Sequence, residues 1–408
     1  MTVSVTVHRG TAEIGGTCIE IRALSGERLI LDAGRPLDAP PSTRELLPQS
    51  LDQSGSATVL ICHPHQDHWG LISELPAGWE VITGEASAKL IAITARLARH
   101  DLGRDLSTWA SRRSFDRGVF RVTPILTDHS GFDACMLLVE VEGRRILYSG
   151  DFRLHGRKSV LVERLMRSPP ADLDMLIIEG TNLGTDKPTI CEAELEDQFV
   201  ELAGRTSGRL FVTWSGQNID RTVTLYRAAR RCGRTLVIDL YTAEVLEAVA
   251  DGTRIPRPGF PNLTVVLTRS LRRHYDLLGR HDFLSRMAQN GIGAGRLENC
   301  NHIVMVRDGL IADYRAKGVT PTPDDAYSFS MWGGYLSKLS PALEWFRAAG
   351  ANIQHLHTSG HASAAAFRNF AAAMNARVTI PVHGANWDRE QSGFAGLVRL
   401  SDGEAYHL

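Results

Sequence analysis

Three histidines and one aspartate stand within six residues near the start of the chain, in the segment His63-Pro64-His65-Gln66-Asp67-His68. The apolar run 58–62 that precedes them is typical of a buried strand. Side chains two positions apart in an extended segment point the same way, so His63 and His65 can meet one cation. Asp67 and His68 can serve a second one. Imidazole nitrogen and carboxylate oxygen are zinc ligands, and the spacing predicts a two-metal centre suited to displacement at phosphorus.

Six residues of one segment cannot complete two metal sites, and the sequence supplies three further candidates. Each follows an apolar run directly: His129 comes after 122–126, Asp151 after 147–150, and His383 closes the segment 381–383. If these runs are strands that end at one edge of a sheet, the three side chains can meet in a common cleft. The carboxylate of Asp151 can bridge two metals through its two oxygens. A histidine that stands alone is more often a hydrogen-bonded structural residue, which is our interpretation of His8, His100, His155, His274, His281 and His302.

The elements that must position these residues fall into three regions. The first predicts strands at 3–8, 18–21 and 28–31, a helix at 87–99, strands 134–141 and 145–148 around a turn, and strand 175–178 before Glu179. After residue 185, helices near 191–204, 218–232 and 242–250 alternate with strands 210–213 and 235–239, which predicts a parallel sheet with covering helices. The last region predicts a strand at 352–356, an alanine-rich helix, a strand at 378–380 and a hairpin within 397–408.

Composition restricts the class of protein. The chain has 408 residues, 43% hydrophobic and 22% charged, which predicts a soluble globular protein of two domains. The net charge of -1 gives no support for a nucleic-acid partner, although a local basic groove would not show in this sum. Six scattered cysteines without CxxC spacing predict reduced thiols and a cytoplasmic location. The absence of a signal-peptide core or a long apolar stretch predicts that no membrane is involved.

The pattern His-x-His-x-Asp-His with later His, Asp and His ligands resembles the metallo-β-lactamase superfamily, over residues 1–185 and 351–408. The resemblance implies an α/β fold, an αββα four-layer sandwich with two zinc ions at one edge, manganese being the alternative metal. Segments 12–16, 31–34, 149–153, 179–182 and 359–362 are similar to the ribonuclease J group, whose members carry an inserted α/β domain called β-CASP. The implied domains are 1–185 and 351–408 for the metallo-β-lactamase parts and 186–350 for the insert. The C-terminal domain of ribonuclease J is expected to be absent, and the oligomeric state is left open between monomer and homodimer.

The resemblance also implies roles for the site residues. His63, His65 and His129 would hold one zinc, Asp67, His68 and His383 the other, and Asp151 would bridge them. His361 is the candidate general acid that protonates the leaving oxygen, since imidazole gives up a proton easily near neutral pH. Glu179 would orient that imidazole, and Asp67 counts among the catalytic residues as well as the ligands.

Five residues are candidates for contacts with the substrate, and each has a structural alternative. His357 and Ser359 could hold a phosphate or serve a turn. Asn218 and Arg221 could contact a phosphate or nucleotide, or Asn218 could cap a helix. Trp332, with Tyr335, could stack bases or belong to the core.

These features together predict a zinc-dependent hydrolase that cleaves phosphodiester bonds of RNA, in endo mode, from the 5′ end, or both. The late histidine His383 is typical of family members that act on RNA, whereas the DNA-repair branch tends to have valine there. The alternatives are a DNA nuclease of the same fold, a small-ester hydrolase, and a non-catalytic RNA-binding subunit. The insert and the Glu179–His361 pair argue against a small ester, and the complete set of seven ligands argues against a non-catalytic protein.

Overall fold

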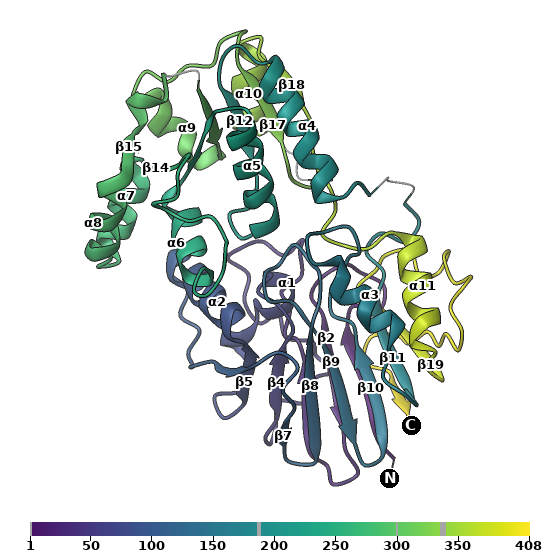
Figure 1. Cartoon of the computed structure of the whole chain (residues 1–408). Helices are drawn as coiled ribbons and strands as arrows, with labels where there is room; N and C mark the ends of the chain where they lie inside the picture. The colour runs from purple at the N-terminus through teal and green to yellow at the C-terminus, as the bar shows by residue number, and fades with distance from the viewer. Residues whose placement is uncertain (1, 186–188, 299–300, 335–339) are drawn as a thin grey trace. The chain divides into compact units, whose positions relative to one another are not determined.

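The chain divides into two compact units, which the computed structural model describes over residues 2–185, 189–298, 301–334 and 340–408. Unit 1 comprises Met1–Thr189 and Gly360–Leu408, and unit 2 comprises Ile190–Ser359 (Figure 1). Each unit has its own sheet or sheets and its own apolar core.

Unit 1 contains two sheets. The first has seven strands in the order β20-β1-β2-β3-β4-β5-β6. Their bounds are β1 (Ser4–Arg9), β2 (Cys18–Arg22), β3 (Arg28–Leu31), β4 (Thr58–Ile61), β5 (Glu80–Gly84), β6 (Ser107–Trp109) and β20 (Ala405–His407). The second has six strands in the order β19-β11-β10-β9-β8-β7. Their bounds are β7 (Phe115–Arg117), β8 (Phe120–Leu126), β9 (Cys135–Val141), β10 (Arg144–Tyr148), β11 (Met175–Glu179) and β19 (Val378–Val382).

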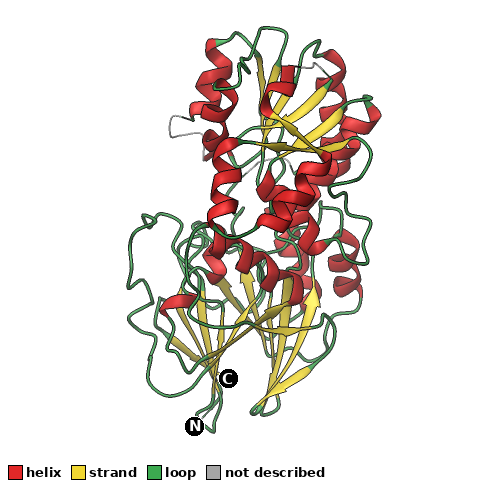
Figure 2. Ribbon diagram, turned by 90° about the vertical axis from the view of Figure 1, so that its left-hand side faces the viewer, coloured by secondary structure: helices red, strands yellow, loops and turns green. Residues whose placement is uncertain are grey.

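The two sheets of unit 1 pack face to face, and helices cover their outer faces (Figure 2). Inner side chains such as Ile21 of β2 and Val139 of β9 are fully buried in one shared cluster. On the outer face of the first sheet, Val59 packs in a cluster with Ile91 of α2 (Glu85–Leu97). On the outer face of the second, Leu147 shares a cluster with residues of α3 (Ser159–Arg167) and α11 (Ala364–Met374). The predicted αββα four-layer sandwich is therefore confirmed.

The second sheet brings several strand ends to one edge. Strands β10, β11 and β19 are parallel, while β9 runs antiparallel to both β10 and β8. The carboxyl ends of β8, β10, β11 and β19 consequently lie at the same edge. The turn between β9 and β10 consists of Glu142 and Gly143, both with positive φ (49° and 80°), as a two-residue hairpin requires. The predicted hairpin is confirmed.

Unit 2 is built on a parallel sheet in the order β15-β14-β13-β16-β12-β17-β18. The strands are β12 (Leu210–Thr213), β13 (Thr235–Ile238), β14 (Leu263–Leu267), β15 (Gly291–Gly293), β16 (His302–Met305), β17 (Ala326–Phe329) and β18 (Asn352–Gln354). The helices are α4 (Glu192–Arg205), α5 (Ile219–Arg231), α6 (Leu240–Val249), α7 (Arg269–Leu277), α8 (His281–Asn290), α9 (Asp308–Arg315) and α10 (Pro341–Ala348). The parallel sheet predicted from alternating helices and strands is confirmed.

Two sequence expectations differ from the structure. Strand β18 pairs with β17 and so belongs to unit 2, whereas the sequence grouped residues 351–356 with the last region. The predicted hairpin within 397–408 is wrong: β20 pairs with β1, and Leu397 bridges to Thr379. Strand β18 satisfies its backbone groups with the strand that precedes it in the chain, and β20 does so with the first strand, and turn residues alone do not reveal either choice. Within the described ranges, no helix is long and apolar enough to cross a membrane.

Candidate metal centre and active site

The seven predicted ligands come together in unit 1, and the strand directions explain why. His129 and Asp151 follow the carboxyl ends of β8 and β10, and His383 follows that of β19. These ends share one edge of the second sheet. The remaining ligands follow β4 of the first sheet, with His63 and His65 in the connecting loop and Asp67 and His68 in the one-turn helix α1 (Gln66–Trp69).

The ligand atoms form two groups that share Asp151. The first group is His63, His65, His129 and Asp151, and the second is Asp67, His68, Asp151 and His383. Within each group the ligand atoms lie within 4.8 Å of one another. Oδ2 of Asp151 lies 3.6 Å from Nε2 of His63 and 3.2 Å from Nε2 of His68. Its Oδ1 lies 3.8 Å from Nε2 of His383, so the carboxylate of Asp151 lies close to ligands of both groups.

The donor atoms fit a pair of cations. Nε2 of His63, of His68 and of His383, and Oδ1 of Asp151, are buried and have no hydrogen-bond partner among the described residues. A buried polar atom without a partner costs roughly 1–3 kcal/mol, so four of them in one cluster require a compensating interaction. Imidazole nitrogens and carboxylate oxygens are the ligands that zinc prefers. The cluster can thus hold two metal ions.

Hydrogen bonds behind the ligands orient three of the rings. Nδ1 of His68 donates to Oδ2 of Asp32 (2.8 Å), and Nδ1 of His129 donates to the carbonyl of Gly360 (2.6 Å). Nδ1 of His383 contacts the hydroxyl of Thr17 (2.9 Å). With Nδ1 engaged in this way, Nε2 of each ring is directed to the centre, as is usual for histidine ligands of metals.

Sequence reasoning missed these positioning residues. Asp32 is fully buried and also accepts hydrogen bonds from the Tyr148 hydroxyl (2.7 Å) and the Cys62 amide (2.8 Å). It stands directly after the apolar strand β3, which is the same signal that identified Asp151 after β10. In the sequence, residues 31–34 indicate only a resemblance to a family motif. Thr17 carries no comparable signal.

Backbone geometry at the site is also specific. A Cβ at Gly34 would lie 1.8 Å from the carbonyl oxygen of Asp67, so only glycine allows the loop after β3 to approach α1. His383 has φ of 49°, which is uncommon for a residue other than glycine. Its amide donates to Gly10 and its carbonyl accepts from Gly180, and these bonds hold the ring in place (2.7 and 3.2 Å).

The electrostatic environment favours the ligand forms of His63, His129 and Asp151. At His68, burial lowers the pKa, but the nearby Asp151 outweighs it and raises this pKa well above its ordinary value. Burial, together with the nearby His68, holds the pKa of His63 well below its ordinary value, and burial with His65 does the same for the pKa of His129. Burial alone would raise the pKa of Asp151, but His383 and His68 outweigh it and hold this pKa well below the usual range. Neutral imidazoles and an ionised carboxylate are the states that bind metals.

The predicted acid pair lies beside this centre. Glu179, the last residue of β11, is buried, and its Oε2 accepts a hydrogen bond from Nδ1 of His361 (2.9 Å). Its Oε1 accepts from the Phe152 amide (2.8 Å). Burial lowers the pKa of His361, but Glu179 and Asp151 outweigh it and raise this pKa to about 9. Nδ1 of His361 lies 3.8 Å from Oδ2 of Asp151, so the ring is next to the ligand cluster.

The loop that carries His361 is fixed on both sides. The amide side chain of Asn182 donates to the carbonyls of His361 and Ala362 (3.0 Å each). The Ala362 amide donates to the Phe152 carbonyl (2.7 Å), and Ser363 caps α11 by accepting from the Ala366 amide. The position of the imidazole therefore depends on several backbone contacts.

The predicted substrate residues Asn218 and Arg221 make structural contacts in unit 2. Asn218 caps α5 by accepting from the Arg221 amide (3.0 Å). The Arg221 guanidinium is fully buried and lies 3.3 Å from Glu192 and 2.8 Å from the Ser330 carbonyl. These contacts favour the capping and structural interpretation, and a phosphate contact by either residue stays a prediction.

His357, Ser359 and Trp332 are the remaining substrate candidates. Nδ1 of His357 lies 3.5 Å from the Arg221 guanidinium, and burial together with that charge lowers its pKa to about 3. His357 and Ser359 are half-buried, whereas Trp332 is 53% exposed and so is not a core residue. Tyr335, named with Trp332 as a stacking candidate, lies outside the described residues. Substrate contact by these side chains stays a prediction.

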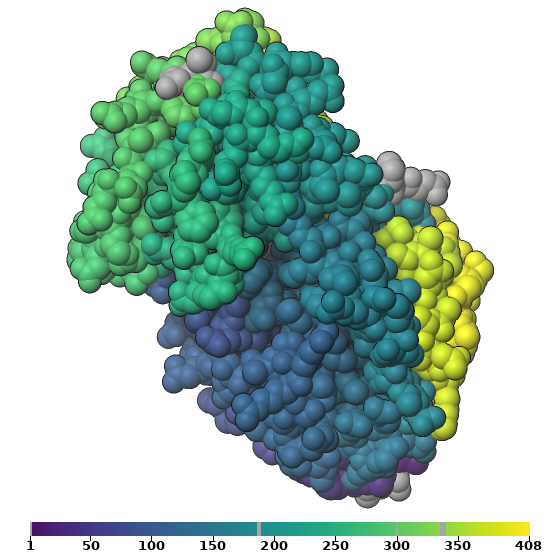
Figure 3. Space-filling view, viewed as in Figure 1, coloured from purple at the N-terminus to yellow at the C-terminus, as the bar shows by residue number. Residues whose placement is uncertain are grey.

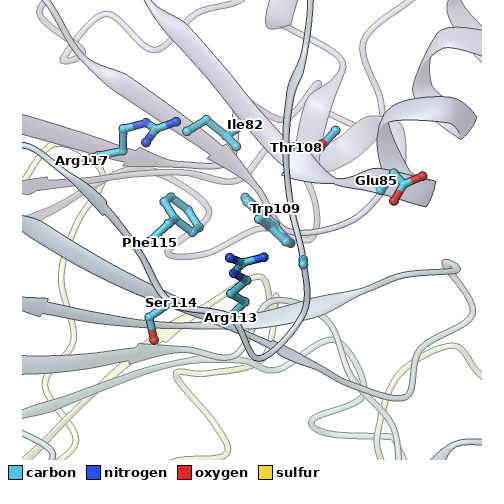
Figure 4. A pocket seen from close by; sticks show the side chains of 9 residues that line it. Ile82, Glu85, Thr108, Trp109, Arg113, Ser114, Phe115 and Arg117 are labelled. Carbon is cyan, nitrogen blue, oxygen red and sulfur yellow. The ribbon is translucent and has the colours of Figure 1, made fainter.

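A separate cavity of about 370 Å³ opens beside β6 and β7 of unit 1 (Figure 4). Trp109 and Phe115 stack there at 6.1 Å, and Arg117 pairs with Glu80 at 3.0 Å. None of the predicted site residues lines this cavity.

The chain is similar to known proteins in sequence and in fold. Residues 13–194 match the model of the metallo-beta-lactamase superfamily. The chain is 26% identical to ribonuclease J of Thermus thermophilus over 259 residues, which cover 56% of this chain and 43% of that protein. It is 22% identical to ribonuclease J of Helicobacter pylori strain 26695 over 416 residues, covering 94% of this chain and 56% of that protein. The chain thus spans about half the length of these curated relatives. A crystal structure of a protein of unknown function from Enterococcus faecalis V583 has the same fold, with a TM-score of 0.80, 18% identity and full coverage of both chains.

Proposed function

We propose that this chain, whose residues 13–194 belong to the metallo-β-lactamase superfamily, is a metal-dependent hydrolase that cuts phosphodiester bonds of RNA. One observation carries the proposal: two groups of mostly buried donor residues share Asp151, and the Glu179–His361 pair lies directly beside them. Two adjacent metal sites with a proton donor beside them are suited to hydrolysis at phosphorus.

The ligand roles follow from the two groups of donors. His63, His65 and His129 would hold one ion, Asp67, His68 and His383 the other, and Asp151 both. The histidine-rich donor set favours zinc over manganese. When bound, the metal ions supply Lewis acidity, which lowers the pKa of water and neutralises charge that develops on phosphoryl oxygens.

The protein itself supplies the proton for the leaving oxygen. Because Nδ1 of His361 is engaged by Glu179, the proton would leave from Nε2. The buried Glu179 carboxylate keeps the ring protonated near neutral pH and fixes its plane. The side chain of His361 is 20% exposed, so a substrate can reach it. Asp67, whose side chain is 15% exposed, is the most accessible acidic group of the ligand set and would act at the substrate side of its metal.

RNA is the proposed substrate because the curated relatives are named ribonuclease J. Unit 2 would be the inserted β-CASP domain, since it interrupts unit 1 and is a parallel sheet with covering helices. Its role would be to bind the RNA strand. Cleavage could occur at internal bonds, from the 5′ end, or both, and the time course described next distinguishes these modes.

A time course on labelled oligonucleotides tests the function. RNA and DNA of the same sequence would be labelled at the 3′ end, with 5′-monophosphate and 5′-triphosphate versions, and the bound metal would be counted in parallel. We expect two metal ions per chain and cleavage of RNA. Early fragments of intermediate length indicate internal cuts, whereas stepwise shortening from the 5′ end indicates exonuclease action. Cleavage of DNA alone would refute the RNA assignment, and hydrolysis of small esters alone would refute the phosphodiesterase.

A further inference from the structure

Unit 2 contains a large cavity that the proposed active site does not use. It lies at the carboxyl ends of β14 and β15, beside the first residues of α7, and has a volume of about 970 Å³. Strands β14 and β15 are neighbours in the sheet, α7 begins two residues after β14 ends (Figure 1), and α7 contributes to the surface (Figure 3). Pockets of about 300–1,000 Å³ hold ligands of nucleotide size. In parallel α/β sheets, ligands bind beyond the carboxyl ends of the strands.

Positive charge is concentrated around the cavity. Five exposed cationic side chains line it, and none forms an ion pair with a described residue: Arg269, Arg272, Arg273, Arg296 and Lys317. Two carboxylates also line it, but both are engaged, Asp276 with His281 (3.0 Å) and Asp313 with the Ser270 amide (2.8 Å). Five positive against two negative side chains leave an excess of three positive charges. An anion would relieve the repulsion among them.

A buried hydroxyl gives independent evidence for a ligand. Thr268 lines the cavity, is 1% exposed and is the N-cap residue of α7. A threonine at this position normally accepts a hydrogen bond from the first turn of its helix. The Thr268 hydroxyl makes no such bond, and it has no other partner among the described residues. A phosphate oxygen could accept its proton, and the N-terminus of the nine-residue helix favours a negative charge at the same place.

The backbone on the opposite side of the cavity is accessible. A Cβ at Gly293 would meet no atom within 4 Å, and at Gly295 it would meet only the Lys317 carbonyl at 3.8 Å. A ligand can therefore approach the backbone where η2 (Ala294–Glu298) begins. No aromatic side chain is among the described lining residues, so the cavity is suited to phosphate groups rather than to a stacked base.

We propose that this cavity binds a ligand that carries two or more phosphate groups. Five cationic side chains, the Thr268 hydroxyl and the N-terminus of α7 supply more donors than one phosphate can use. The same chemistry could come from a free nucleotide or pyrophosphate, or from successive phosphates of an RNA strand. The cavity beside β6 and β7 does not share these features, because its Arg117 is paired with Glu80.

Calorimetric titration of the full-length protein with inorganic pyrophosphate at constant ionic strength tests the proposal. The variant R272Q/R273Q removes two cavity charges and should bind roughly tenfold or more weakly per arginine. The control R227Q/R254Q removes two exposed charges of the same unit that do not line the cavity, and should bind like the wild type. Thr268→Val removes only the hydroxyl. It should bind several-fold more weakly without a loss of thermal stability, because that hydroxyl has no partner among the described residues.

The outcomes are distinct. If pyrophosphate does not bind, if R272Q/R273Q binds it like the wild type, or if the control loses as much affinity, the proposal is overturned. Displacement of pyrophosphate by a nucleoside triphosphate but not by an RNA oligomer without terminal phosphates identifies free polyphosphates as the source. Displacement by the oligomer identifies the RNA backbone. Because binding rather than cleavage is measured, the result does not depend on the proposed nuclease activity.

Discussion

Asp32→Asn is expected to weaken metal binding on the His68 side of the centre by roughly 10–100-fold. The Asp32 carboxylate is fully buried, and its Oδ2 accepts from Nδ1 of His68. If the asparagine oxygen keeps the bond to the Cys62 amide, its NH₂ group faces His68 instead. Nδ1 must then become an acceptor, and the proton moves to Nε2, where the metal needs a lone pair. A hydrogen bond to a charged group contributes about 1.5–3 kcal/mol, which corresponds to this range of affinity.

Tyr148→Phe is the matched control, because it removes a neighbour of Asp32 and leaves the carboxylate and its bond to His68 in place. Asp32 has φ of 61°, a conformation that asparagine tolerates, so D32N adds no backbone strain. Zinc affinity would be measured by competition with a chromophoric chelator, beside the thermal midpoint of each apo protein. We expect the second zinc to be weakened in D32N and little changed in Y148F. Wild-type affinity in D32N, or an equal loss in both variants, would refute the tautomer argument.

Three further predictions concern the shared ligand, the acid and the stability of the first sheet. Asp151→Ala should lower the metal content of the purified protein and abolish cleavage, because Asp151 belongs to both donor groups; two tightly bound ions in this variant would contradict the bridging role. His361→Ala should keep both metals and slow cleavage by about 10²–10⁴-fold, measured in single-turnover assays, and full activity would exclude it as the acid. Burial raises the pKa of Glu20, but His8 and Arg28 outweigh it and lower this pKa to about 2. The folded pKa lies below the unfolded one, so this stabilisation is present above about pH 4.5 and is lost as the pH falls toward 2. Glu20→Gln should therefore flatten the dependence of urea unfolding on pH in this window.

The sequence predicted which side chains meet at this site because His63, His129, Asp151 and His383 each lie within three residues of the end of a strand. The order of strands in the sheet was not needed, since parallel strands end at one edge whatever their order. The histidine spacing at 63–68 required further ligands, and apolar runs pointed to His129, Asp151 and His383. The structure brings these residues together, although their roles stay proposals until metal is measured.

What the sequence did not reveal depends on contacts between distant segments. Thr17 meets His383 across 366 positions, and Asp32 meets Tyr148 across 116. A single hydroxyl or carboxylate carries no periodic signal, so such partners are identified only when the fold is known. The prediction for the end of the chain was wrong for the same reason. Local turn residues indicated a hairpin, whereas β20 pairs with β1.

The protonation of the histidine cluster explains why a cation, and not a set of protons, is expected at its centre. Nδ1 of His68 faces a carboxylate and Nδ1 of His129 faces a carbonyl, so each donates, and in the neutral ring Nε2 then carries a lone pair. Lone pairs that converge in a buried space repel one another. Protonation relieves this by charging a ring. Asp151 favours a proton on His68 by raising its pKa, but burial opposes protonation of the adjacent His63 and His129 by lowering theirs. A divalent cation accepts several lone pairs at once without this penalty, and the ionised Asp151 between the two groups balances part of its charge.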